Sequence, residues 1–182
     1  MSGFQNKIRQ IARDTDKYLH QCFKKQEAKS YLLKPMKYGL FSGGKRFRSK
    51  IIVDTGKIFN INYNLLKALS AAVECVHSYS LIHDDLPSMD DDDIRRGKLS
   101  THKKFGESTA ILSGNSLLAL AFEILSDEKF KLKSKIKMEL IYSLATCSGY
   151  SGMAGGQYLD LNFEHKKVNK LQLIEMQNKK TG

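Results

Sequence analysis

The sequence predicts an all-α fold, and three observations lead to that prediction. Apolar residues recur every three or four positions in several long segments, which is the period of a helix with one buried face. Proline occurs only at positions 35 and 87, so little interrupts these segments. No segment shows the alternation of apolar and polar residues that is typical of a half-buried strand.

The predicted helices follow one another along the chain. The first carries a single apolar face, formed by Phe4, Ile8, Ile11, Thr15, Tyr18, Leu19 and Cys22. The helical pattern breaks near residues 38–39, and further helices are expected at 51–59, 65–86, 107–126, 133–150 and 168–177, with a glycine-rich break, SGMAGGQ, at 151–157. Segment 65–86 is apolar nearly all round, so we expect it at the centre of a helical bundle.

Length and composition favour one domain that covers residues 1–182. No apolar run reaches the ~18 residues that span a bilayer, so stable membrane insertion is not expected. The amino-terminal stretch lacks the apolar core of a secretion signal. Cys22, Cys75 and Cys147 form no metal-ligand pair and no disulfide framework, so they are expected to be small core residues of a cytoplasmic protein.

The chain is strongly basic, with a formal net charge of +11. Such an excess favours an anionic partner, whether nucleic acid, membrane surface or phosphorylated metabolite. Nucleic acid is not expected, because no aromatic and basic recognition motif accompanies the charge. A cluster of aspartates would also repel nucleic-acid phosphates in the absence of metal.

That cluster is the segment HDDLPSMDDDDIRRG at residues 83–97, in which six aspartates lie between Asp84 and Asp93. Carboxylates this close repel one another and need a counter-charge. A solvated acidic loop is the simplest alternative to a metal site. An EF-hand is excluded, because no register places Gly at the sixth and Glu at the twelfth position. Carboxylates without cysteine favour Mg²⁺ or Mn²⁺ over zinc.

Asp84 and Asp90 are the expected ligands of this ion. On an unbroken helix, residues six apart would point about 240° away from each other. Pro87 cannot donate to the carbonyl of His83, so the helix kinks or ends there. Segment 86–89 can then bring Asp90 back beside Asp84. Mg²⁺ typically binds one or two carboxylates in this way and completes its shell with water and substrate phosphates.

Two basic segments can hold anions. Arg95 and Arg96 follow the aspartates, and arginine beside a carboxylate-bound metal suits a diphosphate, although pairing with the aspartates at 91–93 is the alternative. The turn SGGKRFR at 42–48 places two glycines before its bases, so the backbone can approach an anion closely. A solvated basic turn is the alternative here. Two anion sites predict two phosphorylated substrates.

The motifs MKYGLFSGGKRFR, AVECVHSYSLIHDDLPSMDDDDIRRG, THKKFGE, ILSGNSLLALAFEIL, GGQYLDL and KTG occur, from about Lys29 on, in the order of the trans-prenyltransferases, or polyprenyl synthases. The sequence most resembles the bacterial-type farnesyl diphosphate synthases. The resemblance implies an isoprenoid-synthase-type helical bundle around a central cavity, usually as a homodimer. It also implies head-to-tail condensation of isopentenyl diphosphate with an allylic diphosphate (dimethylallyl or geranyl diphosphate), with Mg²⁺ as cofactor and Mn²⁺ as a substitute.

The resemblance assigns roles by position. Lys45, Arg48, His77 and Arg96 match the contacts of isopentenyl diphosphate, and Arg95, Lys180 and Thr181 match positions that hold the allylic diphosphate. Asp84, Asp85 and Asp90 match the first metal-binding motif. The expected catalytic residues are therefore Asp84, Asp90, Arg95 and Lys180. Without the resemblance, a lone helical histidine such as His77 is more often a core or surface residue than a ligand.

Tyr79 is the expected determinant of product length. It lies five residues before Asp84, which on a helix corresponds to about 140° of rotation and ~7.5 Å along the axis. It can therefore sit below the metal site, where an aromatic residue resembles the floor that stops chain elongation in this family. This predicts a C15 product, farnesyl diphosphate, with C10 as the shorter alternative and a simple core tyrosine as the other interpretation.

The sequence departs from the family pattern in several places. Ser49 and Leu99 stand where proline is common, and Asn115 stands where aspartate is usual. The sequence given ends at KTG, before the second aspartate-rich motif that family members carry. We therefore expect either the amino-terminal part of a complete enzyme or a short chain that is inactive alone. The latter would be a non-catalytic diphosphate-binding or partner subunit of the same fold.

Overall fold

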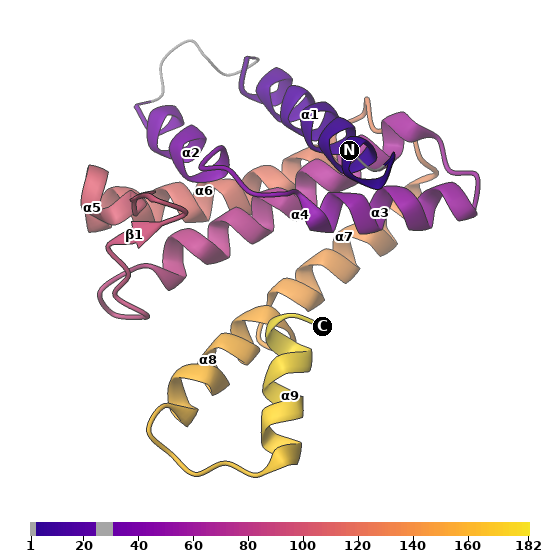
Figure 1. The fold of residues 1–182 in the computed structure, drawn as a ribbon. Helices are drawn as coiled ribbons and strands as arrows, with labels where there is room; N and C mark the ends of the chain where they lie inside the picture. The colour runs from indigo at the N-terminus through magenta and orange to yellow at the C-terminus, as the bar shows by residue number, and fades with distance from the viewer. Residues whose placement is uncertain (1–2, 25–30) are drawn as a thin grey trace. The chain divides into compact units, whose positions relative to one another are not determined.

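A computed structural model describes residues 3–24 and 31–182, and within these ranges the fold is helical (Figure 1). The all-α prediction is thereby confirmed. The chain divides into two compact units, Met1–Lys131 and Leu132–Gly182. A single domain over residues 1–182 stays a prediction. Lys29, where the family resemblance begins, lies outside the described residues.

The first unit is built around helix α4 (Tyr63–Asp84), as expected for segment 65–86. Helices α1 (Gly3–Lys24), α2 (Leu33–Leu40), α3 (Phe47–Ile58) and α6 (Glu107–Ser126) pack against it, and the short α5 (Thr101–Phe105) packs against α6 (Figure 1). Ten residues of α4 are buried: Leu66, Ala68, Ser70, Ala71, Ala72, Glu74, Cys75, Val76, Ser78 and Ile82. Small residues in this set allow the neighbouring helices to approach closely.

Helices α4 and α6 are also long and apolar enough to cross a membrane by length and composition alone. This corrects the statement that no run in the chain reaches that length. The most apolar 18-residue window is 56% buried inside the protein in α4 and 44% buried in α6. A central bundle helix has the same composition as a membrane span because both are surrounded by apolar groups.

The predicted apolar face of α1 is confirmed at its centre and wrong at its start. Ile11, Thr15 and Leu19 are buried together with Phe23, which the sequence analysis did not include. Phe4 is 58% exposed, and the ammonium of Lys50 lies 4.9 Å from the centre of its ring. The amino-terminal end of α1 therefore extends beyond the core, where a cation covers the ring.

A short antiparallel ribbon, β1 (Ile94–Arg95) with β2 (Lys98–Leu99), was not expected. Its turn consists of Arg96 and Gly97, which both have positive φ, at 53° and 75°. Two consecutive positive φ values are those of the type I′ turn, whose twist suits a tight hairpin. A two-residue strand is too short to produce an alternating pattern, so the sequence offered no signal beyond the Arg-Gly pair.

The second unit contains α7 (Ser134–Ser148), α8 (Met153–Phe163) and α9 (Lys170–Lys180). The glycine-rich break expected at 151–157 is wrong after residue 152, because α8 runs through Gly155 and Gly156. A Cβ atom on Gly156 would lie 2.2 Å from the backbone nitrogen of Lys180. Glycine is needed here so that α9 can cross α8 in close contact, which overrides its poor helix propensity.

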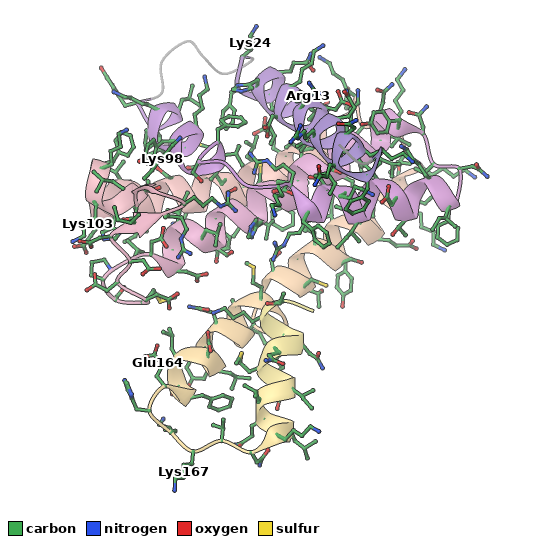
Figure 2. All side chains as sticks on the ribbon, viewed as in Figure 1. Arg13, Lys24, Lys98, Lys103, Glu164 and Lys167 are labelled. Atoms are coloured by element: carbon green, nitrogen blue, oxygen red, sulfur yellow. The ribbon has the colours of Figure 1, made fainter. Side chains whose placement is uncertain are left out.

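The basic surface of the first unit is largely solvated. The side chains of Lys24, Lys98 and Lys103 extend outward from the backbone (Figure 2).

All three cysteines are free, but only Cys75 is buried, while Cys147 is exposed. The expectation of three core cysteines is therefore wrong for Cys147, because the face of α7 that carries it is open to solvent.

A hydrogen bond between α1 and α4 provides a test of the packing. The Tyr63 hydroxyl donates to Asp14 Oδ2 at 2.7 Å. We expect Tyr63→Phe to lower the free energy of unfolding by about 1 kcal/mol, because this change leaves the ring in place and removes the donor. Urea denaturation measures the loss. Tyr31→Phe is the control, since Tyr31 is 100% exposed; equal stability of the two variants would contradict the expected role.

Candidate functional site

The chain turns back on itself directly after α4. The backbone N–H of Asp90 donates to the carbonyl oxygen of Asp84 at 2.9 Å. Within this turn Met89 N–H donates to the carbonyl of Leu86 at 2.8 Å, and Asp92 N–H donates to that of Asp85 at 3.2 Å. The return of Asp90 to Asp84, expected from Pro87, is confirmed, so both carboxylates start from adjacent backbone positions.

Asp85 has a different environment from its neighbours. It is 2% exposed, and Arg95 donates to its Oδ1 from Nε at 2.7 Å and also from Nη2. Arg95 Nη2 lies 3.0 Å from Asp92 Oδ2 as well. Burial raises the pKa of Asp85 above its usual range, although the arginine opposes this shift. The pairing with residues 91–93 that was the alternative for Arg95 is therefore present at Asp92, and the pairing with buried Asp85 was not expected.

A third group of possible ligands lies in the same loop region. Asp91, Asp93 and His102 each offer one ligand atom, and these atoms lie within 4.8 Å of one another. Lys103 Nζ is 2.8 Å from Asp93 Oδ1 and so supplies a positive charge to this group. Sequence reasoning did not include His102, which follows Asp93 by nine residues and is brought back to it by the β1–β2 ribbon.

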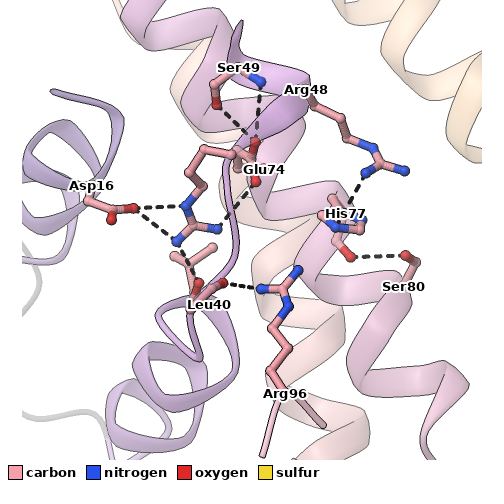
Figure 3. Close-up of polar contacts among 10 residues, drawn as sticks. Asp16, Leu40, Arg48, Ser49, Glu74, His77, Ser80 and Arg96 are labelled. Carbon is pink, nitrogen blue, oxygen red and sulfur yellow. Dashed lines mark hydrogen bonds and ion pairs between the residues drawn. The ribbon is translucent and has the colours of Figure 1, made fainter. Parts of the chain in front are cut away.

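The basic turn at 42–48 contacts the arginine that follows the aspartates (Figure 3). The guanidinium of Arg96 donates from Nη1 to the carbonyl oxygen of Gly43. A Cβ atom on Gly44, whose φ is 112°, would lie 2.5 Å from the same Nη1. Glycine at 44 therefore permits this contact. Since Arg95 and Arg96 are consecutive, one dipeptide connects the acidic loop to the basic turn.

His77 and Arg48 lie beside each other in this region. Arg48 Nη1 is 3.4 Å from His77 Nε2, and the contact joins the first turn of α3 to the middle of α4 (Figure 3). Burial and, next, the positive charge of Arg48 lower the pKa of His77 to about 4. His77 is consequently a neutral imidazole at pH 7. Lys45, the residue before Arg46, is exposed in the turn.

A buried ionic network that the sequence analysis missed lies beneath this turn. Glu74 of α4 is 2% exposed and accepts from Arg46 Nη1 at 3.2 Å. Arg46 also donates from Nε to Asp16 at 2.9 Å and from Nη2 to the carbonyl of Leu40 at 2.7 Å. The available signal was Glu74 itself, because an acidic residue within an otherwise apolar helix requires a buried partner.

Tyr79 is half-buried on α4 and packs edge-on against His83, with ring centres 4.8 Å apart. His83 Nε2 lies 3.1 Å from the carbonyl of Ile111 on α6. Burial raises the pKa of Tyr79, and the negative charge of Asp84 adds to the shift. The phenol is therefore within electrostatic reach of Asp84, on the helix that ends there.

Lys180 and Thr181 belong to the second unit, at the end of α9. Lys180 Nζ is paired with Asp160 of α8. Thr181 N–H donates to the carbonyl of Gln177 at 3.0 Å and so closes the helix. Of the predicted residues in the first unit, the structure pairs Arg48 with His77 and returns Asp90 to Asp84. Lys180 and Thr181 lie in the second unit.

The neutral state of His77 yields a pH prediction. The pKa of His77 in the folded protein, about 4, is below the ordinary value of 6.5. The contribution of the neutral ring to the free energy of unfolding is therefore present above pH ~6.5 and is lost as pH falls through about 4. We expect the imidazole signals of His77 in NMR to titrate with a midpoint near 4. Arg48→Met should raise that midpoint, because it removes a neighbouring positive charge. A midpoint near 6.5 in the unaltered protein would contradict the burial of the ring.

Comparison with known proteins gives a consistent result. The family profile described as Polyprenyl synthetase matches residues 29–182. Farnesyl diphosphate synthase of Buchnera aphidicola from Acyrthosiphon pisum is 52% identical over 151 residues, which cover 81% of this chain and 54% of that protein. The Escherichia coli enzyme of the same name is 49% identical over 152 residues, which cover 83% of this chain and 51% of that protein.

Solved structures agree with the sequence relatives. An FPP/GFPP synthase from Zymomonas mobilis superposes with a TM-score of 0.91 at 40% identity, over 97% of this chain and 64% of that one. A geranyltransferase from Legionella pneumophila gives a TM-score of 0.90 at 38% identity, over 97% of this chain and 62% of that one. The fold is thus the all-helical isoprenoid synthase fold, and the chain spans about half the length of the curated relatives named above.

Proposed function

Because the chain belongs to the polyprenyl synthetase family, we propose that the whole protein condenses isopentenyl diphosphate with dimethylallyl or geranyl diphosphate. In this reaction the bond between C1 of the allylic substrate and its diphosphate oxygen breaks. A carbon–carbon bond forms to isopentenyl diphosphate, a proton is lost, and inorganic diphosphate leaves. Farnesyl diphosphate is the proposed product, and a cytoplasmic homodimer is the proposed form of the protein.

One observation supports this function above the others: the loop that returns Asp90 to Asp84 is followed directly by Arg95, which pairs with Asp85, and by Arg96, which reaches the basic turn. We call the acidic loop at 84–93 the acidic pole and the basic turn at 42–48 the basic pole. Arg95 and Arg96 connect the two. The acidic pole suits a diphosphate that arrives with a divalent cation. The basic pole suits a diphosphate without one, since arginine and lysine alone neutralise it.

The residues of the acidic pole fit Mg²⁺. Asp84 and Asp90 supply hard oxygen ligands from adjacent backbone positions. Asp85 is buried and accepts from Arg95. Mn²⁺ would bind the same ligands. When bound, the ion would neutralise the diphosphate and make it a better leaving group. In this proposal Asp84 and Asp90 are the principal ligands, and Asp85 orients Arg95.

The basic residues bind and orient the two substrates. Lys45, Arg48, His77 and Arg96 would hold the diphosphate of isopentenyl diphosphate, and neutral His77 can donate one hydrogen bond to an anionic oxygen. Arg95, Lys180 and Thr181 would hold the allylic diphosphate. Positioning by these charges, together with exclusion of water around a carbocation, is the main task of the protein in such a reaction.

Substitution of the metal ligands tests the proposal. We expect Asp84→Asn and Asp90→Asn each to lower the Mg²⁺-dependent condensation rate of the whole gene product at least 100-fold, because each removes a ligand charge. Release of inorganic diphosphate measures the rate. Asp14→Asn, on α1, is the matched control and should stay within twofold of the unaltered protein.

Two results of that assay would contradict the proposal. Unchanged turnover in both aspartate variants would remove the acidic loop from the reaction. Binding of both diphosphates without any condensation by the unaltered protein would favour the non-catalytic binding subunit of the same fold.

Product length tests the role of Tyr79. We expect Tyr79→Ala to shift the product from C15 toward C20 and longer, because a methyl group in place of the ring deepens the space beside Asp84. Chromatography of the dephosphorylated products measures their length. Tyr142→Ala, at an exposed position on α7, is the control. An unchanged C15 product from Tyr79→Ala would show that this ring is not the floor.

A further inference from the structure

We propose that Glu74 is a positioning residue for the basic turn at 42–48 and thereby determines the affinity for isopentenyl diphosphate. This inference rests on the proposed function, which assigns Lys45 and Arg48 to that substrate. Glu74 contacts neither of them. It acts through Arg46 of the turn and through Ser49 in the first turn of α3, which are both buried (Figure 3).

The charge of Glu74 is buried at a cost that must be offset. Its side chain is 2% exposed, and it lies on the helix with the most buried residues in the described part of the chain. Three donors reach its carboxylate: Arg46 Nη1 at 3.2 Å, Ser49 Oγ at 2.9 Å and Ser49 N–H at 3.3 Å. A buried carboxylate with an arginine and two further donors is strongly held, and loss of its charge would leave the guanidinium of Arg46 without its anionic partner on α4.

Arg46 adopts a conformation that needs such support. Its φ is 48°, in the left-handed region that side-chain-bearing residues rarely occupy, and it immediately precedes α3. The side chain is only 4% exposed, and its partners are Glu74, Asp16 and the carbonyl of Leu40. Arg46 therefore serves the fold of the turn, because its guanidinium is enclosed by protein groups. The neighbouring bases remain for the ligand.

Ser49 connects Glu74 to the start of α3. Ser49 is the third residue of this helix, and N–H groups in the first turn have no acceptor within their own helix. Glu74 accepts from that N–H at 3.3 Å and so caps α3 from another helix. A proline, common at this position in the family, would supply neither the N–H nor the hydroxyl. In this chain two of the three donors to Glu74 therefore come from Ser49.

The geometry carries this support to the binding residues. Arg48 lies between the two tethered residues, and its Nη1 is 3.4 Å from Nε2 of His77. His77 is three residues after Glu74, so both side chains project from the same face of α4. One face of α4 thus fixes the start of α3 through Glu74 and faces the substrate through His77. A change at Glu74 would displace Arg48 and Lys45 from that substrate.

The test compares two ligands on the whole gene product. Isothermal titration calorimetry in EDTA gives the Kd of isopentenyl diphosphate, and titration with Mg²⁺ present gives the Kd of dimethylallyl diphosphate. For Glu74→Gln we expect at least tenfold weaker binding of isopentenyl diphosphate, because the turn loses its charged anchor. The Kd of dimethylallyl diphosphate should change less than twofold. Ser49→Ala, which removes one of three donors, should weaken isopentenyl diphosphate two- to threefold.

Controls separate positioning from general loss of stability. Tyr63→Phe removes a hydrogen bond between α1 and α4 away from the turn and should leave both Kd values within twofold. If Glu74→Gln does not fold, Ser49→Ala carries the test. Unchanged affinity, or equal weakening of both ligands, in these variants would overturn the role of Glu74. Failure of the unaltered protein to bind isopentenyl diphosphate in EDTA would instead refute the assigned function of the turn.

Discussion

Helix α4 has to be buried along most of its length, and yet it carries Glu74 and His77 at its centre and Asp84 at its end. Each of these groups imposes a demand on the surrounding structure. Glu74 requires donors and obtains them from the start of α3. His77 is desolvated and therefore neutral at pH 7. Asp84 lies at the end of α4, where the chain leaves the core and the aspartates that follow at 90–93 are exposed. The arrangement of α3, the basic turn and the acidic loop follows from these requirements.

The two loops are coupled by a single short element. The β1–β2 ribbon presents Arg95 to Asp85 and Arg96 to the carbonyl of Gly43. Its tight turn requires positive φ at residues 96 and 97, which glycine at 97 adopts without strain. Arg95 at the end of β1 and Arg96 in the turn thus have different partners, so the ribbon links the acidic loop to the basic turn. In the proposed reaction, each of the two regions would hold one diphosphate.

Much of this could be predicted from the sequence, for identifiable reasons. Helical periodicity predicted the bundle, and Pro87 predicted the return of Asp90 to Asp84, since proline chemistry is local. The ribbon and the helical course of Gly155 and Gly156 could not be predicted. The ribbon is too short to have a period, and the glycines are explained only by the close approach of α9. The network of Glu74 was missed because its partners, Arg46 and Ser49, are distant in sequence, as is Asp16, which binds Arg46.

Anomalous scattering from Mn²⁺ tests most directly whether the returned loop is a metal-dependent diphosphate site. Crystals of the whole gene product would be soaked with MnCl₂ and inorganic diphosphate, and data would be collected at the manganese edge. The proposed function predicts an anomalous peak within coordination distance of the carboxylates of Asp84 and Asp90, with diphosphate oxygens completing the shell. A peak found only among Asp91, Asp93 and His102, or no peak at Asp84 and Asp90, would contradict it.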